Sequence, residues 1–224
     1  MKRFLVSLAA CIGLMGLSYG GMQGHHGGHE GHMSSNMSCN LQVEEGLSDN
    51  PSKEIMDLMH APMMCQEWVR SGDADMDFLK NMIPHHKGAI LSAKAFLKYS
   101  QDAKLREIAQ NIIATQESEI DSFSALIEKL AMQKPQKSKS YEKFAKQAQM
   151  DMSEMMRAMG EVSPTGNVDR DFIAAMIPHH QGAVSASKQI LALSKNPQVK
   201  QFAKDIIAAQ EAEVRMFEEL LKAM

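Results

Sequence analysis

The sequence lacks the motifs of the common catalytic folds. It has no Gly-rich phosphate loop, no dinucleotide-binding fingerprint and no Ser-His-Asp arrangement. No stretch of useful length alternates apolar and polar residues, which argues against β-strands. With 24 basic and 27 acidic residues, the chain also lacks the positive excess that would favour a nucleic-acid partner. These absences indicate an all-α protein that is not an enzyme and does not bind nucleic acid.

Long apolar runs are absent beyond the N-terminus. Lys2 and Arg3 precede an apolar run over residues 4–17, and a small-x-small site follows at 18–20. This pattern predicts a signal peptide over residues 1–20, because the run is too short for a convincing membrane span. Lipoprotein processing at Cys11 is the alternative. Cleavage after residue 20 removes two basic residues, so that the net charge falls from −3 to −5, and predicts a periplasmic or secreted protein without a stable membrane anchor.

Cysteine is scarce, with three in the whole chain. Cys11 leaves with the signal peptide, and Cys39 and Cys65 remain in a compartment where disulfides persist. An even pair in that setting is most simply one disulfide. Binding of a metal by the two thiolates is the alternative.

Residues 21–50 form a leader rich in Gly, Ser, His and Met and without apolar periodicity. Such a composition predicts disorder in the absence of a ligand. Short His-rich tracts bind metals without needing a fold, so the leader is interpreted as a metal-gathering tail, with a plain flexible leader as the alternative. Its histidines are His25, His26, His29 and His32.

One uncommon phrase occurs twice in the chain. Met82-Ile83-Pro84-His85-His86 returns 94 residues later as Met176-Ile177-Pro178-His179-His180, and the flanking residues align without a gap at the same offset. The repeat predicts one helical domain over residues 51–132, a polar linker over 133–140 and a second helical domain over 141–224. The pattern leaves open whether the two form one bundle or two.

Helical periodicity places the repeated phrase on an inward face. Pro51 opens a first helix that is expected to end near Gly72, the acidic cluster from Asp73 starts a second, and a third covers about 102–132. Buried histidines need polar partners. Two positions in each half are candidates to hydrogen-bond and orient them: Gln116 and Glu119 in the first half, and Gln210 and Glu213 in the second. For the two glutamates, a solvated helix face is the alternative.

Thioether and imidazole ligands within one helical turn favour Cu(I), with Cu(II) tolerated and zinc less suited. The predicted metal ligands are Met82, His85, His86, Met176, His179 and His180, as two similar sites. Secondary candidates are the leader histidines with Met56, Met59 and His60, and also Met150 and Met155. The competing interpretation is that most of the 20 methionines fill gaps in the core.

These motifs carry a family resemblance. The Met-Ile-Pro-His-His-x-Gly-Ala core and the downstream Gln-Glu-x-Glu helix resemble the secreted bacterial family known as domain of unknown function three hundred and five. The resemblance implies a ferritin-like four-helix bundle, and copper binding in some members. Di-iron and di-manganese bundles need inward Glu-x-x-His pairs, and no Glu-x-x-His occurs in this chain, so the fold does not imply oxidase chemistry.

The sequence as a whole predicts a copper-binding protein that sequesters or carries copper in support of copper tolerance or homeostasis. Its partners would be the metal ion and a copper donor or acceptor protein that the sequence does not identify. Two other classes remain as alternatives: a secreted metal-dependent redox or stress enzyme on the same bundle, and a purely structural helical interaction module.

Overall fold

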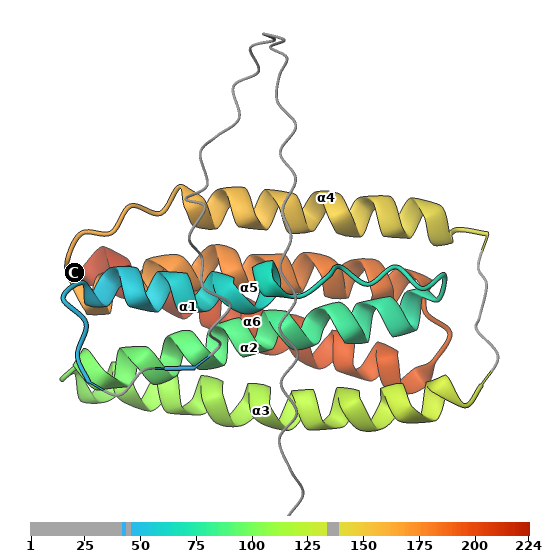
Figure 1. The fold of residues 1–224 in the computed structure, drawn as a ribbon, viewed down its shortest axis with the longest axis horizontal. Helices are drawn as coiled ribbons and strands as arrows, with labels where there is room; N and C mark the ends of the chain where they lie inside the picture. Colours follow the sequence, from blue (N-terminus) through green and yellow to red (C-terminus); the bar gives the residue numbers. More distant parts are fainter. Residues whose placement is uncertain (1–41, 44–45, 134–138) are drawn as a thin grey trace, which may run out of the picture. The chain divides into compact units, whose positions relative to one another are not determined.

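The structure is a computed structural model that describes residues 42–43, 46–133 and 139–224. No strand occurs among these residues, so the all-α prediction is confirmed (Figure 1). The helices are α1 (Pro51–Cys65), α2 (Ala74–Tyr99), α3 (Ala103–Ala131), α4 (Tyr141–Gly160), α5 (Val168–Leu193) and α6 (Pro197–Ala223). The predicted signal peptide, the leader histidines and Cys39 lie outside the described residues.

Helices α2 and α5, which carry the repeated phrase, are the central elements of the bundle. Helix α2 packs against α1, α3 and α5, and α5 packs in turn against α4 and α6. In Figure 1, α4 runs along one side of this pair and α3 along the other. The six helices belong to one compact unit, so the two halves form one bundle. The predicted domain boundaries within it stay a prediction.

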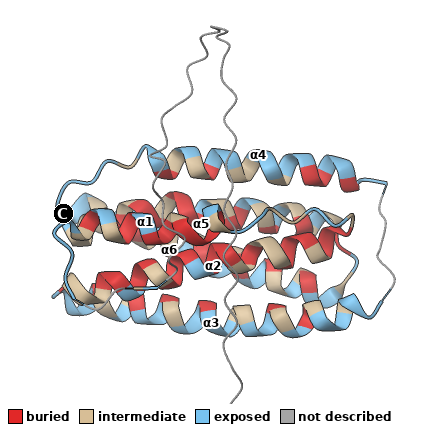
Figure 2. Ribbon diagram, in the orientation of Figure 1, coloured by how far each residue is buried: buried red, intermediate tan, exposed pale blue. Residues whose placement is uncertain are grey.

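Burial follows this arrangement (Figure 2). Buried residues crowd α1, α2 and α5, whereas α3 and α4 carry them as a stripe on one face. Between the halves, the rings of Phe96 and Phe172 stack with centroids 4.2 Å apart. Within the described ranges, no helix has both the length and the apolarity needed to cross a membrane.

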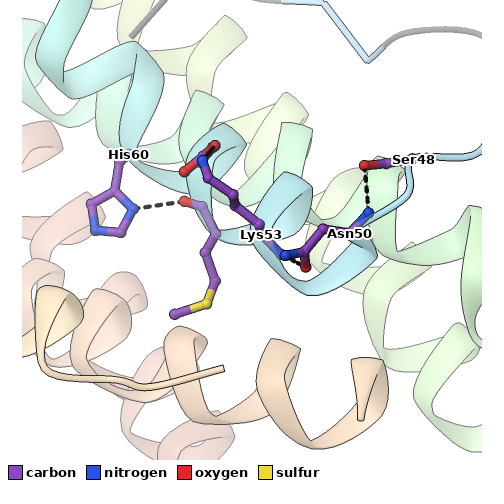
Figure 3. A network of polar contacts seen from close by, with 6 residues as sticks. Ser48, Asn50, Lys53 and His60 are labelled. Carbon is purple, nitrogen blue, oxygen red and sulfur yellow. Dashed lines mark hydrogen bonds and ion pairs between the residues drawn. The ribbon is translucent and has the colours of Figure 1, made fainter. Parts of the chain in front are cut away.

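The helices begin where the sequence supplies capping side chains. The Asn50 Oδ1 accepts a hydrogen bond from the Lys53 N–H at 3.1 Å, ahead of Pro51 at the first helical position (Figure 3). Asp73 caps α2 by accepting from the Asp75 N–H at 3.0 Å. The predicted start of the second helix at the acidic cluster is therefore confirmed.

The predicted end of the first helix near Gly72 is wrong, because α1 ends at Cys65. After α1 the backbone adopts an extended conformation at Gln66. The Asn81 side chain then accepts from the Val69 N–H and donates to the Val69 carbonyl, both at 2.9 Å. These bonds take up backbone groups that a longer helix would have used. The extended segment is thereby held against α2.

Cys65 is disulfide-bonded. The predicted partner, Cys39, lies outside the described residues, so the pairing itself stays a prediction.

A buried aspartate organises the loop before each central helix. The Asp77 carboxylate accepts from the Ser71 N–H at 2.8 Å, and Asp171 accepts from the Thr165 N–H at 2.8 Å. The hydroxyl of the same loop residue also donates in each case, at 2.5 and 2.7 Å. A glycine with positive φ shapes each loop, Gly72 at 93° and Gly166 at 83°. The 94-residue correspondence therefore extends into these loops.

Each aspartate also binds the opposite half of the chain. The Tyr141 hydroxyl at the start of α4 donates to Asp77, and the Ser52 hydroxyl at the start of α1 donates to Asp171, both at 2.6 Å. Buried hydrogen bonds to a charged acceptor are among the stronger ones. The two contacts therefore tie the outer helices of one half to the central helix of the other.

We predict that Asp171→Asn destabilises the protein. Burial alone would raise the pKa of Asp171, but hydrogen bonds from Ser52, Thr165 and Gly166 outweigh it and hold that pKa below its ordinary value. Loss of the charged acceptor should lower the free energy of unfolding by roughly 1–3 kcal/mol at neutral pH. The difference from wild type should shrink as the pH falls below about 3.8, where the unfolded carboxylate takes up a proton, and should disappear at the lower pH at which the folded carboxylate is protonated too.

Urea unfolding at several pH values measures this effect. Asp121→Asn, at an exposed position of α3, is the control and should have little effect. Equal stabilities of Asp171→Asn and Asp121→Asn would contradict the assigned role.

Candidate metal centre

The two histidine pairs meet in the middle of the bundle. The ring centroids of His85 on α2 and His179 on α5 lie 3.8 Å apart, and each ring lies about 6 Å from its sequence neighbour. His85 is 6% exposed, and His86, His179 and His180 are fully buried. The sequence predicted two similar clusters without indicating that they touch. In the structure the four imidazoles form one group, called here the histidine cluster.

The outer ring of each pair, that of His86 or His180, lies against a glutamate. The His86 Nε2 donates to the Glu119 carboxylate at 2.8 Å. The His180 Nε2 also lies 2.8 Å from a carboxylate oxygen of Glu213, although its angles fall outside those of a hydrogen bond. On the same helix as each glutamate, a phenylalanine packs on the same imidazole, with Phe123 5.4 Å from His86 and Phe217 5.7 Å from His180.

The inner rings meet across the contact between α2 and α5. The His85 Nε2 donates to the backbone carbonyl of His179 at 3.0 Å. A neutral imidazole carries one proton, so this bond makes Nδ1 of His85 the lone-pair nitrogen. The His86 Nε2 likewise donates, to Glu119, while its Nδ1 has no hydrogen-bond partner among the described residues.

Several ring nitrogens of the histidine cluster have no protein partner. Nδ1 of all four histidines, and Nε2 of His179 and His180, are buried without a hydrogen bond among the described residues. Buried polar atoms are nearly always satisfied, and an unsatisfied one costs about 1–3 kcal/mol. Four such rings at one place indicate a site that binds an electron-pair acceptor.

The inner imidazoles are electrically neutral near pH 7. Burial lowers the pKa of both His85 and His179 well below 6.5, and the neighbouring imidazoles lower it further. The hydrogen bond to the His179 carbonyl only partly opposes this shift for His85. A neutral imidazole is the form that binds metals.

The histidine cluster is not a finished coordination sphere. Within the described parts of the chain, no three His, Cys, Asp or Glu side chains converge closely enough to hold a metal ion as they stand. Binding through the cluster therefore requires rotation of the rings or sulfur ligands. Thioether sulfur is close by along the chain, since the buried Met82 and Met176 each lie three residues before an inner histidine.

The other predicted residues have mixed outcomes. Gln116 and Gln210 are buried as predicted, but their Oε1 atoms have no hydrogen-bond partner in the described part of the chain, so the expected bond to a histidine is not seen there. His60 donates from Nδ1 to the Met56 carbonyl at 2.6 Å, within its own helix (Figure 3). Met56 and Met59 are core residues of α1. Exposed Met150 lies on α4 away from the core.

Two glycines of the repeat have a role that sequence analysis missed. A Cβ at Gly88 would collide with the Met59 carbonyl oxygen and would lie 3.5 Å from the His179 Nε2. A Cβ at Gly182 would collide with the sulfur of Met155. Glycine at these positions lets α1 and α4 approach the central helices beside the histidine cluster. The signal was available, because each glycine follows its histidine pair by two residues in both copies.

Lys94 and Lys188, which correspond at the 94-residue offset of the repeat, lie outside the histidine cluster. Lys94 bonds to Glu117 and Lys188 to Glu211, both at 2.7 Å and all at positions with substantial solvent exposure. Ion pairs of this kind contribute little to stability. They supply a natural comparison for Glu119 and Glu213, which are two residues further along the same helices.

Comparison with known proteins places the chain in a family. The family model described as "Domain of unknown function (DUF305)" matches residues 75–221. The chain belongs to this family. The single match spans both copies of the repeated phrase, and the interpretation of the chain as two tandem copies of the family stays a prediction.

Solved structures of related proteins agree with the fold. A DUF305 fragment from Deinococcus radiodurans is 26% identical, covers 67% of this chain and 97% of its own, and has a TM-score of 0.51. CopM in its Cu(I)-bound form is 27% identical over 70% of this chain and 98% of its own, with a TM-score of 0.51. CopM in its Cu(II)-bound form is also 27% identical, with a TM-score of 0.50, over 66% of this chain and 97% of its own. The predicted ferritin-like all-α bundle of the DUF305 family is confirmed.

An uncharacterized protein of Acanthamoeba polyphaga mimivirus is a further relative. It is 40% identical over 53 residues, which are 24% of this chain. The chain spans about a third of the length of that relative, 35%.

We predict that the metal-free protein loses stability on mild acidification. Unfolded histidines take up protons near pH 6.5, whereas His85 and His179 stay neutral in the fold. The unfolded state therefore binds more protons below that pH, and the free energy of unfolding should fall by about 1.4 kcal/mol for each of the two at about pH 5.5.

Urea unfolding in the presence of a chelator, at about pH 7 and pH 5.5, measures the change. The variant His85→Gln with His179→Gln should show a shallower dependence on pH. Identical pH dependence in the variant and the wild type would contradict the assignment.

Proposed function

We propose that this protein binds copper in the core of its bundle, Cu(I) in preference to Cu(II), and that it sequesters or carries the metal outside the cytoplasm. The observation that carries the proposal is the histidine cluster, in which four buried imidazoles present ring nitrogens without protein partners. Imidazole together with thioether sulfur suits Cu(I) better than zinc or hard cations.

The solved relatives support copper as the ion. CopM, 27% identical to this chain, has been solved in Cu(I)-bound, Cu(II)-bound and Ag-bound forms. Ag(I) is a soft monovalent ion like Cu(I), and both share a preference for sulfur and nitrogen ligands. The chemistry of the histidine cluster fits the same group of ions.

Within the cluster, Glu119 and Glu213 have the positioning role. The Glu119 carboxylate accepts from the His86 Nε2 and leaves Nδ1 of that ring as the nitrogen that can bind, and the Glu213 carboxylate lies 2.8 Å from the His180 Nε2 in the corresponding place. A carboxylate behind a ligating histidine fixes the tautomer and makes the ring a stronger donor. Met82 and Met176 are proposed to supply sulfur ligands as the inner rings rotate toward the ion.

A binding role suits the closed surroundings of the cluster. Its rings are almost completely excluded from solvent, which favours retention of an ion over turnover of a substrate. A metal-dependent redox or stress enzyme would need access for a substrate, and a structural module would have no need of four unsatisfied imidazoles. The proposed location is periplasmic or secreted, where the leader histidines would serve as a weaker, less selective collector.

We predict that the two histidine pairs act as one unit. Because His85 and His179 are in contact, the variants His85→Gln/His86→Gln and His179→Gln/His180→Gln should each lose more than half of the tight Cu(I) binding. Residues in one network are not additive. Competition titration with a chromophoric Cu(I) chelator under anaerobic conditions measures the loss, after circular dichroism has shown that helicity is retained. Unchanged Cu(I) affinity in both folded variants would overturn the proposal.

The glutamates allow a matched comparison. Glu119→Gln with Glu213→Gln should weaken Cu(I) binding by about 10–100-fold, because the carboxylates that orient the outer rings are lost. Glu117→Gln with Glu211→Gln removes the same number of charges from the same helices at the surface ion pairs, and should leave the affinity within about threefold. Equal effects of the two variants would show that only net charge matters.

A further inference from the structure

A cavity of about 60 Å³ lies between α2, α4 and α5, beside the histidine cluster. Its lining includes three thioethers and one imidazole, those of Met82, Met152, Met155 and His85. A water molecule needs about 10–15 Å³ of volume measured in this way. The cavity therefore has room for an ion together with solvent.

We propose that this cavity is a separate binding site for a soft monovalent cation, Cu(I) or Ag(I), held by the sulfurs of Met152 and Met155 on α4 and of Met82 on α2. The proposal goes beyond the proposed function, because Met152 and Met155 of α4 have no part in the histidine cluster; Met82 is common to the two proposals. Met82 and Met155 are buried and Met152 is half-buried, so the sulfur ligands come from both walls of the cavity.

The oxygen atoms of the cavity are already engaged. Asp77 accepts from the Tyr141 hydroxyl at 2.6 Å and from Ser71. Asp151 accepts from the side-chain amides of Gln147 and Gln189. Hard cations such as Mg²⁺ and Ca²⁺ need several free oxygen ligands, and the two carboxylates of the lining are committed to other donors. The donors that remain are thioether sulfurs and the imidazole of His85, which select soft ions.

His85 is common to the cavity and the histidine cluster. It lines the cavity and its ring also contacts His179 at 3.8 Å between centroids, while its Nδ1 is buried without a partner. An ion in the cavity would therefore lie beside His85, with His179 on the other side of that ring. Helix α4, with Met152 and Met155, would then supply the first ligands for a soft ion on its way to the core.

Gly182 sets the position of one sulfur. A Cβ at this residue would collide with Sδ and Cγ of Met155, which are the far end of a flexible side chain. Gly182→Ala should therefore displace the sulfur while every methionine stays in the chain. This gives a variant that tests the position of the ligand and not its presence.

The test is a titration of the full mature chain with Ag(I), an air-stable probe of the site, followed by calorimetry. Met152→Leu with Met155→Leu keeps the side-chain volume and removes the sulfurs, and it should lose one equivalent of Ag(I). Met159→Leu is the matched control, because Met159 is fully buried on the same helix and does not line the cavity; it should bind as wild type. Gly182→Ala should lower the affinity for this Ag(I) ion about tenfold, because the displaced Met155 sulfur can no longer bind it in the same geometry.

The two sites are distinguished by a variant of the outer histidines. His86→Gln with His180→Gln should retain the equivalent that Met152→Leu/Met155→Leu loses, and silver X-ray absorption of that variant should show sulfur neighbours. The inference is overturned if the methionine variant binds as many Ag(I) equivalents, as tightly, as Met159→Leu. If the double variant does not fold, Met152→Leu alone, at a half-buried position, should weaken the same equivalent, and wild-type binding by that variant would overturn the inference.

Discussion

The contact between α2 and α5 places four desolvated imidazoles against one another, and the rest of the bundle is arranged around that contact. His85 and His179 touch across it, and the outer rings are held from behind by glutamate and phenylalanine side chains of α3 and α6. Glycines on the central helices let α1 and α4 close over the same region. A core with this many unsatisfied nitrogens is costly for the stability of the fold, and binding of an ion, as proposed, would offset that cost.

The two halves depend on each other. Asp77 of the first half binds the first residue of α4, and Asp171 of the second half binds the second residue of α1. Because each central helix holds the outer helix of the other half, neither half retains all of its buried partners alone. The reciprocal pair of aspartates therefore explains how a duplicated sequence folds as one bundle, with its two histidine pairs gathered at the centre.

Features that depend on neighbouring residues of a helix could be predicted from the sequence, whereas contacts between distant helices could not. Periodicity placed each histidine pair on a buried face, and Glu119 and Glu213 were among the candidates to orient these rings, because helical spacing and polar satisfaction act within a few turns. The meeting of the two pairs could not be predicted, since nothing in periodicity determines which buried faces pack together. The end of α1 was missed because the clamp on Val69 comes from Asn81, a side chain of the next helix.

The two glutamates behind the outer rings also determine the charge that the core can accept. Their side chains are 20% and 26% exposed, so each carboxylate keeps some contact with water while it bears on a fully buried ring. The inner imidazoles add no charge near neutral pH. Two acidic side chains thus border a core in which the inner rings carry no charge of their own. A cation bound by the histidine cluster, as proposed, would therefore lie near two acidic side chains and not in a purely apolar interior.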